Sequence, residues 1–121
     1  MLDRIPERFQ PRNISDGNAL NSFLNLDYCT DLEGVDIALA GIPFDLATSN
    51  RPGTKMGPKY LRSRVYKGCK VDEVLDINIG DKLKIVDTGD FKLMGGYLLD
   101  DFALITEQTK KILDAGATPV I

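Results

Sequence analysis

The side chains best suited to chemistry in this sequence are two aspartates at the end of an apolar run. The segment Lys84–Asp90 predicts a strand and places Asp87 and Asp90 at its carboxyl end. Paired carboxylates there could hold a cation or orient a basic substrate. They could also accept hydrogen bonds from loop amides, as aspartate commonly does at turns. The residues themselves leave both roles open.

The chain contains no histidine. This excludes a Ser/His/Asp or Cys/His arrangement within these residues, and any imidazole ligand to a transition metal. Proton transfer near neutral pH would fall to a perturbed carboxylate, lysine or cysteine. Cys29 and Cys69 lie far apart in no metal-like spacing. We therefore interpret both as reduced thiols.

A strand, a long loop and a helix must position any such site. The mostly unbroken apolar run Val35–Ala40 predicts a strand buried on both faces, as in a parallel sheet. Gly41 and Pro43 end it, because proline cannot donate to a ladder. A loop of roughly a dozen residues follows, longer than most connections in βα units. Pro58 then predicts the first turn of a helix.

Within this loop, Asn50 and Arg51 are the candidate substrate-binding residues. They are followed by Pro52 and Gly53, which fix the loop. Loops after the carboxyl ends of parallel strands face the ligand crevice, so we expect both residues at its mouth. The alternative is that Arg51 forms a contact within the loop or with a neighbouring subunit.

A basic segment follows, from Lys55 to Lys70, and no acid interrupts it before Asp72. A helix that faces phosphate or nucleic acid would have this composition. So would the solvated face of a helix that buries Leu61 and Val65, and this second interpretation is favoured. The net charge of −3 provides no general attraction to nucleic acid or to an anionic membrane.

A third segment predicts a helix from about Leu98 to Ala115 that serves only core packing, with Gly116 as its stop. The predicted buried face consists of Leu98, Phe102, Ile105 and Ile112, joined by Leu99, Thr109 and Leu113. Thr118–Ile121 then begins another buried strand. We expect the natural polypeptide to continue beyond it.

With 121 residues, of which 43% are hydrophobic, the chain has the size and composition of one globular domain. Residues 1–33 are polar and predict an N-terminal arm, and residues 34–121 predict an α/β domain with a mainly parallel sheet. No apolar run approaches the length that crosses a bilayer. The first ten residues mix charges and lack the apolar core of a secretory signal. We expect a soluble cytoplasmic protein.

Several separate segments resemble the ureohydrolase (arginase/agmatinase) family. They are Gly41-Ile-Pro-Phe-Asp45, Thr48-Ser-Asn-Arg-Pro-Gly-Thr54, Gly57-Pro58 followed by Leu61-Arg62, Val86-Asp-Thr-Gly-Asp90, and Ala115-Gly-Ala-Thr-Pro-Val-Ile121. The Asn-Arg-Pro-Gly loop is most similar to agmatinases and guanidinobutyrases. The resemblance implies a three-layer α/β fold, two manganese ions, a small guanidino substrate that is hydrolysed to an amine and urea, and a homotrimer or homohexamer.

The chain departs from the family in its metal ligands. In the family these lie in a Gly-Gly-Asp-His-Ser segment, an Asp-Ala-His-x-Asp segment and a later Asp-x-Asp, and none of them occurs here. We therefore expect the N-terminal portion of a ureohydrolase, with no catalytic residue and no metal ligand of its own, and inactive alone. The alternative is a non-catalytic binding or assembly module that keeps the first half of the fold.

Overall fold

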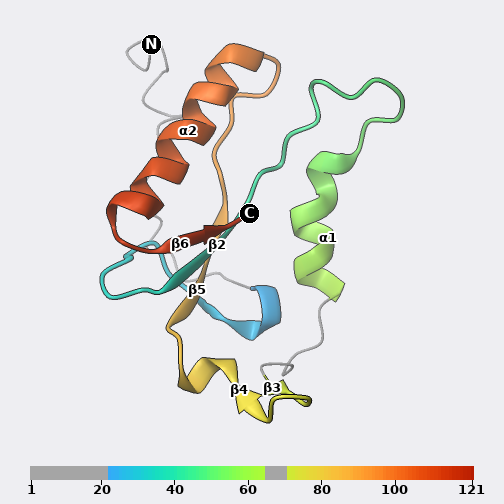
Figure 1. Cartoon of the computed structure of the whole chain (residues 1–121). Helices are drawn as coiled ribbons and strands as arrows, with labels where there is room; N and C mark the ends of the chain where they lie inside the picture. Colours follow the sequence, from blue (N-terminus) through green and yellow to red (C-terminus); the bar gives the residue numbers. More distant parts are fainter. Residues whose placement is uncertain (1–21, 65–70) are drawn as a thin grey trace.

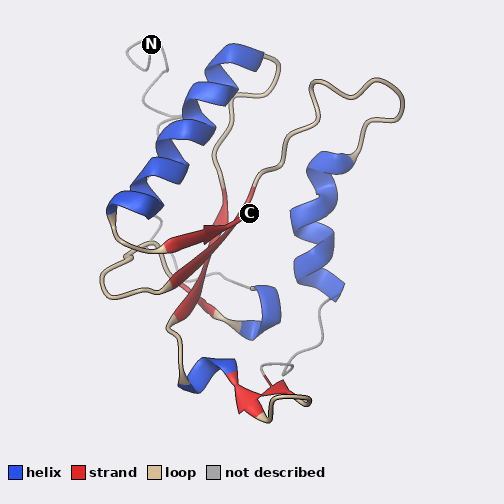
Figure 2. Ribbon diagram, in the orientation of Figure 1, coloured by secondary structure: helices blue, strands red, loops and turns tan. Residues whose placement is uncertain are grey.

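The computed structural model describes residues 22–64 and 71–121. These residues form a four-stranded sheet, a two-stranded hairpin, two α-helices and three short 3-10 helices (Figures 1 and 2). The strands are β1 (Asp27–Tyr28), β2 (Ile37–Gly41), β3 (Val71–Asp72), β4 (Ile77–Asn78), β5 (Ile85–Asp90) and β6 (Thr118–Val120). The helices are η3 (Phe23–Asn25), η4 (Thr54–Met56), α1 (Gly57–Arg64), η5 (Ile79–Asp81) and α2 (Leu98–Asp114).

The main sheet has the strand order β1-β5-β2-β6, and every pairing in it is parallel. The predicted strands at 35–40 and 84–90 are therefore confirmed, and they are the two central strands. Ala38 of β2 lies opposite Val86 of β5, and both are buried. Continuous apolar sequences suit such strands because helices cover both of their faces.

The expected three-layer α/β architecture is confirmed for this part of the fold. Helix α1 covers one face of the sheet and α2 covers the other (Figure 1). The buried core between sheet and helices includes Val35, Ala38, Ala40, Val86, Phe91, Ile112 and Ala117. None of the helices in the described ranges is both long enough and apolar enough to span a bilayer.

The terminal strand β6 was expected to be buried, and this prediction is wrong for the described residues. Its Thr118 and Val120 are exposed, because β6 pairs only with β2 and forms one edge of the described sheet. A run of apolar residues predicts a strand, but it does not reveal whether a second strand pairs with its other edge.

Helix α2 has the predicted length but buries only part of the predicted face. Ile112 is buried and Ile105 packs against the core, as expected. Leu98, Leu99, Phe102 and Leu113 are exposed. The buried residues are Asp101, Leu104, Gln108 and Ile112. Gly116 ends the helix as expected: it has φ +83° and donates to the carbonyl of Leu113, while Ala117 donates to that of Ile112. This pair of bonds is the Schellman arrangement.

Two further differences concern the chain between the central strands. Helix α1 starts at Gly57, as Pro58 predicted, but Leu61 is 59% exposed instead of buried, and Val65 lies outside the described residues. The antiparallel hairpin β3–β4 was not predicted. Its strands have two residues each, too few to show an alternating pattern.

The segment 1–33 contributes to the sheet in its described part. Strand β1 pairs with β5 through Asp27 opposite Val86 and Tyr28 opposite Asp87. Residues 1–21 of the predicted arm lie outside the described ranges. Cys29 is a free thiol. Cys69, like residues 1–21, lies outside the described ranges.

Candidate functional site

The carboxyl ends of β2 and β5 form the candidate site because the chain leaves these neighbouring strands in opposite directions. After β2 it leads to α1 on one face, and after β5 it leads to α2 on the other (Figure 1). Ligands of open α/β sheets bind in the crevice between such diverging loops. Here Gly41 lies opposite Asp90, and the Phe91 amide donates to the Gly41 carbonyl at 2.8 Å.

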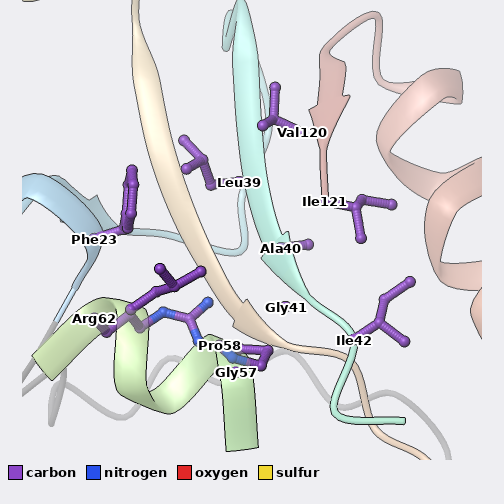
Figure 3. A pocket seen from close by; sticks show the side chains of 11 residues that line it. Phe23, Leu39, Ala40, Gly41, Ile42, Gly57, Pro58, Arg62, Val120 and Ile121 are labelled. Atoms are coloured by element: carbon purple, nitrogen blue, oxygen red, sulfur yellow. The ribbon is translucent and has the colours of Figure 1, made fainter. Parts of the chain in front are cut away.

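A buried ion pair connects α1 to β5 at this edge. Nε of Arg62 donates to Oδ2 of Asp87 at 2.8 Å, and Nη2 donates to Oδ1 at 2.9 Å. Asp87 is 0% exposed. Figure 3 shows the Arg62 side chain extending from α1 toward the sheet. Such a bidentate contact fixes both the distance and the orientation of the two groups.

The same guanidinium also reaches the end of β5. Nη1 of Arg62 donates to Oδ1 of Asp90. The backbone there is closely packed: a Cβ atom at Gly41 would overlap Oδ1 of Asp90 and lie 2.6 Å from Cβ of Pro58. Glycine at this position therefore lets β2, β5 and α1 meet around Arg62.

Hydrogen bonds decide the ionisation of the pair. Burial alone would raise the pKa of Asp87, but hydrogen bonds from Arg62 and from the Phe23 and Gly89 amides outweigh it and lower that pKa. Burial would lower the pKa of Arg62, but the hydrogen bonds from Arg62 to Asp87 and Asp90 outweigh this effect. The pKa of Arg62 therefore lies well above the usual value for arginine. Burial, followed by the charge of Asp87, raises the pKa of Tyr28. The cluster therefore holds a charged pair beside a neutral phenol.

The partners of Asp87 are groups of the protein itself. Asp87 accepts from the amides of Phe23 in η3 and Gly89 in β5, both at 2.8 Å, and not from loop amides as expected. It also accepts from Arg62, so the interpretation of the basic segment as a solvated helix face is wrong for this residue. The sequence contained one signal for this contact: Arg62 is four residues after Pro58, on the same helical face.

The residues of this cluster do not fit a metal ion. Both oxygens of Asp87 are already hydrogen-bonded, and Oδ1 of Asp90 faces a guanidinium. Across the described ranges, no group of three or more His, Cys, Asp or Glu residues is arranged to hold a metal. Oxygen-rich sites for manganese need several free carboxylates or imidazoles.

The loop after β2 is closed at its base by Asp45. Oδ2 of Asp45 accepts from the Gly53 amide at 2.8 Å, and its backbone carbonyl accepts from the Thr48 hydroxyl at 2.8 Å. Asn50 and Arg51 lie between these closures, and both are exposed. Both residues therefore belong to the loop that projects beyond the sheet between β2 and α1 (Figure 1).

The loop after β5 is held by polar residues of α2. Oδ1 of Asp101 accepts from the Met94 amide at 2.7 Å, and Gln108 exchanges two hydrogen bonds with the backbone of Lys92 at 3.0 and 3.1 Å. Both side chains are buried. The prediction that α2 serves only core packing is therefore wrong, because it also positions this loop.

An apolar cavity of about 370 Å³ lies between α1 and the ends of β2 and β6 (Figure 3). Its lining includes Phe23, Leu39, Ile42, Leu61, Val120 and Ile121. Arg62 borders it, but its guanidinium is already bound to the two aspartates. The cavity thus offers apolar surface and no free charged group from this cluster.

Comparison with known proteins gives concordant matches. The model of the arginase family matches residues 35–121. The mitochondrial agmatinase of Gallus gallus is 33% identical over 99 residues, which cover 82% of this chain and 29% of that protein. The mitochondrial guanidino acid hydrolase of Homo sapiens is also 33% identical over 99 residues, covering 82% of this chain and 28% of that one.

A solved structure gives the same result. A hypothetical agmatinase from Burkholderia thailandensis has a TM-score of 0.76 and 30% sequence identity, and the match covers 81% of this chain and 32% of that chain. The present chain thus spans less than a third of the length of these relatives.

Proposed function

Because this chain belongs to the arginase family, we propose that it is the amino-terminal portion of a ureohydrolase that hydrolyses a guanidino compound to an amine and urea. The supporting observation is the family match over residues 35–121, which includes the Asn50-Arg51-Pro52-Gly53 loop at the carboxyl edge of the sheet. The relatives named agmatinase and guanidino acid hydrolase favour agmatine or a guanidino acid as the substrate.

In this proposal the described residues provide the scaffold at one side of the cleft. Arg62 fixes α1 against the ends of β2 and β5, and Asp45 closes the base of the loop. The loop then presents Asn50 and Arg51 to the substrate. Arg51 suits an anionic tail on a guanidino acid or a neighbouring carboxylate that holds the loop.

The metal ions of the proposed enzyme require ligands from outside these residues. Two manganese ions would lower the pKa of a shared water, which is needed because the guanidinium carbon is a poor electrophile. The cluster around Arg62 does not fit them. We therefore propose that the 121 residues alone neither bind manganese tightly nor release urea.

The test is urea release by the natural polypeptide that contains this sequence. We expect manganese-dependent release from agmatine, guanidinobutyrate or guanidinopropionate. Calorimetry with manganese on residues 1–121 alone should give no stoichiometric binding in the micromolar range. Tight binding with urea release by the short chain would contradict the assignment of the ligands.

The second candidate is a non-catalytic binding or assembly module. It is favoured by the absence of histidine from the whole chain. If the natural polypeptide releases no urea from any of the three compounds, the module becomes the better assignment. The cytoplasmic location and the lack of nucleic-acid and membrane partners expected from the sequence stay predictions.

A further inference from the structure

The β3–β4 hairpin carries an exposed tip in which acids enclose two apolar side chains. The tip is the segment Glu73-Val74-Leu75-Asp76. Val74 is 92% exposed and Leu75 is 66% exposed, and both acids are exposed as well. Figure 1 shows the hairpin projecting from the main sheet on the side opposite the loop of Asn50 and Arg51. The two apolar side chains form a small exposed patch rimmed by acids, a composition that is typical of interaction sites.

The tip has a defined conformation. Oδ1 of Asp72 accepts from the amides of Val74 and Leu75 at 2.9 and 3.0 Å. Asp76 has φ +50°, the left-handed conformation that aspartate and asparagine tolerate best. A segment held in one conformation loses little entropy when it binds, so the tip is suited to docking as a unit.

The outer face of α1 has the complementary composition. Lys59, Tyr60, Ser63 and Arg64 lie on one side of this helix and all are exposed. Tyr60 is 61% exposed and offers an apolar ring between the two bases. Pro58 and Arg62 lie on the opposite side, toward the sheet. No acid occurs between Asp45 and Asp72, so the helix itself carries only positive side-chain charges.

We propose that the hairpin tip Glu73–Asp76 docks on the outer face of α1 of a second copy of this chain. The two surfaces are complementary in charge and in polarity. The acids Glu73 and Asp76 would meet the bases Lys59 and Arg64. The apolar side chains of Val74 and Leu75 would cover the Tyr60 ring. Both surfaces are exposed among the residues that the structure describes. This proposal does not depend on the catalytic one.

Two kinds of symmetry fit a contact between two different surfaces. If each copy places its tip on the next copy, the contact joins copies head to tail and gives a ring or a filament. If two copies place their tips on each other's helix, the same contact gives a two-fold dimer.

Charge exchange between the two surfaces tests the contact in the natural polypeptide. One variant carries Glu73→Lys with Asp76→Asn, since asparagine keeps the left-handed conformation. The other carries Lys59→Glu with Arg64→Glu. In sedimentation velocity at low salt, each variant alone should self-associate roughly tenfold more weakly than the wild type. One polypeptide that carries all four changes should recover the association, because every contact between its copies is again complementary in charge. Lys110→Glu, on exposed α2 surface, is the control that should change nothing.

A crosslink identifies the partner surface directly. A photoreactive p-benzoylphenylalanine at Leu75, in the otherwise unchanged polypeptide, should crosslink to residues 59–64 of an isotopically distinguishable second copy. Crosslinks between copies at another segment, or none at all, would overturn the proposal. So would charge variants that associate like the wild type, or a polypeptide with all four changes that recovers nothing.

Discussion

The guanidinium of Arg62 and the buried carboxylate of Asp87 face each other in a bidentate contact, with nitrogen–oxygen distances of 2.8 and 2.9 Å. Arg62 is on the helix that follows β2, and Asp87 is on β5. The contact therefore joins two segments separated by 25 positions and fixes the helix against the edge of the sheet from which the loop of Asn50 and Arg51 projects.

Removal of Arg62 should destabilise the fold strongly. Arg62→Ala leaves Asp87 buried without its counterion, and breaking a buried pair in this way costs about 3–5 kcal/mol. Urea unfolding measures the effect. Lys110→Ala, on exposed surface, should stay within about 0.5 kcal/mol of the wild type.

The double variant Arg62→Met with Asp87→Leu separates the loss of the pair from the cost of the unpaired charge. Replacing both partners by apolar side chains of similar size is often nearly neutral. We expect it to recover only part of the stability lost in Arg62→Ala, because Asp87→Leu also removes the acceptor of the Phe23 and Gly89 amides. If the single variant unfolds at the wild-type urea concentration, the pair does not hold α1 in place.

The stability of the fold should depend on pH through Asp87. Its pKa in the folded protein lies below its ordinary value of 3.8, so the ionised carboxylate favours the folded state. This contribution is complete above the ordinary value and is lost as the pH falls through the lower folded value. The difference in unfolding free energy between the wild type and Asp87→Asn should therefore shrink below about pH 4. A constant difference down to about pH 2 would contradict the lowered pKa.

Gly41 and Gly57 form a matched pair for testing the packing around Arg62. A methyl group at Gly41 would overlap Asp90 and Pro58, whereas nothing lies within 4 Å of a Cβ at Gly57. Gly41→Ala should cost about 1–3 kcal/mol in urea unfolding, because strand and helix must separate. Gly57→Ala lies at the helical φ of −52° and should be neutral or stabilising by up to about 1 kcal/mol. Equal effects would show that the close approach at Gly41 is unimportant.

Asp45 should control the order of the loop that contains Asn50 and Arg51. Asp45→Ala removes the acceptor of the Gly53 amide, so hydrogen exchange of residues 46–53 should become faster. Lys55→Ala is the control, because Lys55 is exposed and its Nζ is 3.8 Å from Asp45. That weak contact predicts little change. Unchanged exchange in Asp45→Ala would mean that the prolines and glycines alone hold the loop.

Arg51→Ala in the natural polypeptide tests the substrate role of the loop. Loss of one charge-assisted hydrogen bond to substrate should lower kcat/KM by the equivalent of about 1.5–3 kcal/mol. Because Arg51 is exposed at the tip of the loop, its removal should leave the unfolding free energy within about 0.5 kcal/mol. An unchanged kcat/KM with every guanidino substrate would make the loop a scaffold.

Local patterns in the sequence determined the elements that depend on neighbours along the chain. The unbroken apolar runs gave the two central strands, and Pro58 and Gly116 gave the start of α1 and the stop of α2. The family was also accessible, because its motifs are short and contiguous. Each of these inferences rests on residues within a few positions of one another.

Only the tertiary structure decided the contacts between distant residues. It paired Arg62 with Asp87 and Asp90. In α2 it buried the polar residues Asp101 and Gln108 and left Leu98 and Phe102 exposed. It also placed β6 at an edge of the described sheet. Periodicity shows that a helix has an apolar side, but burial depends on what packs against that side. From the sequence alone, a charged residue is assigned to the surface. It can be buried only where the tertiary structure provides a counterion that compensates the cost of its desolvation, and the sequence does not show that counterion.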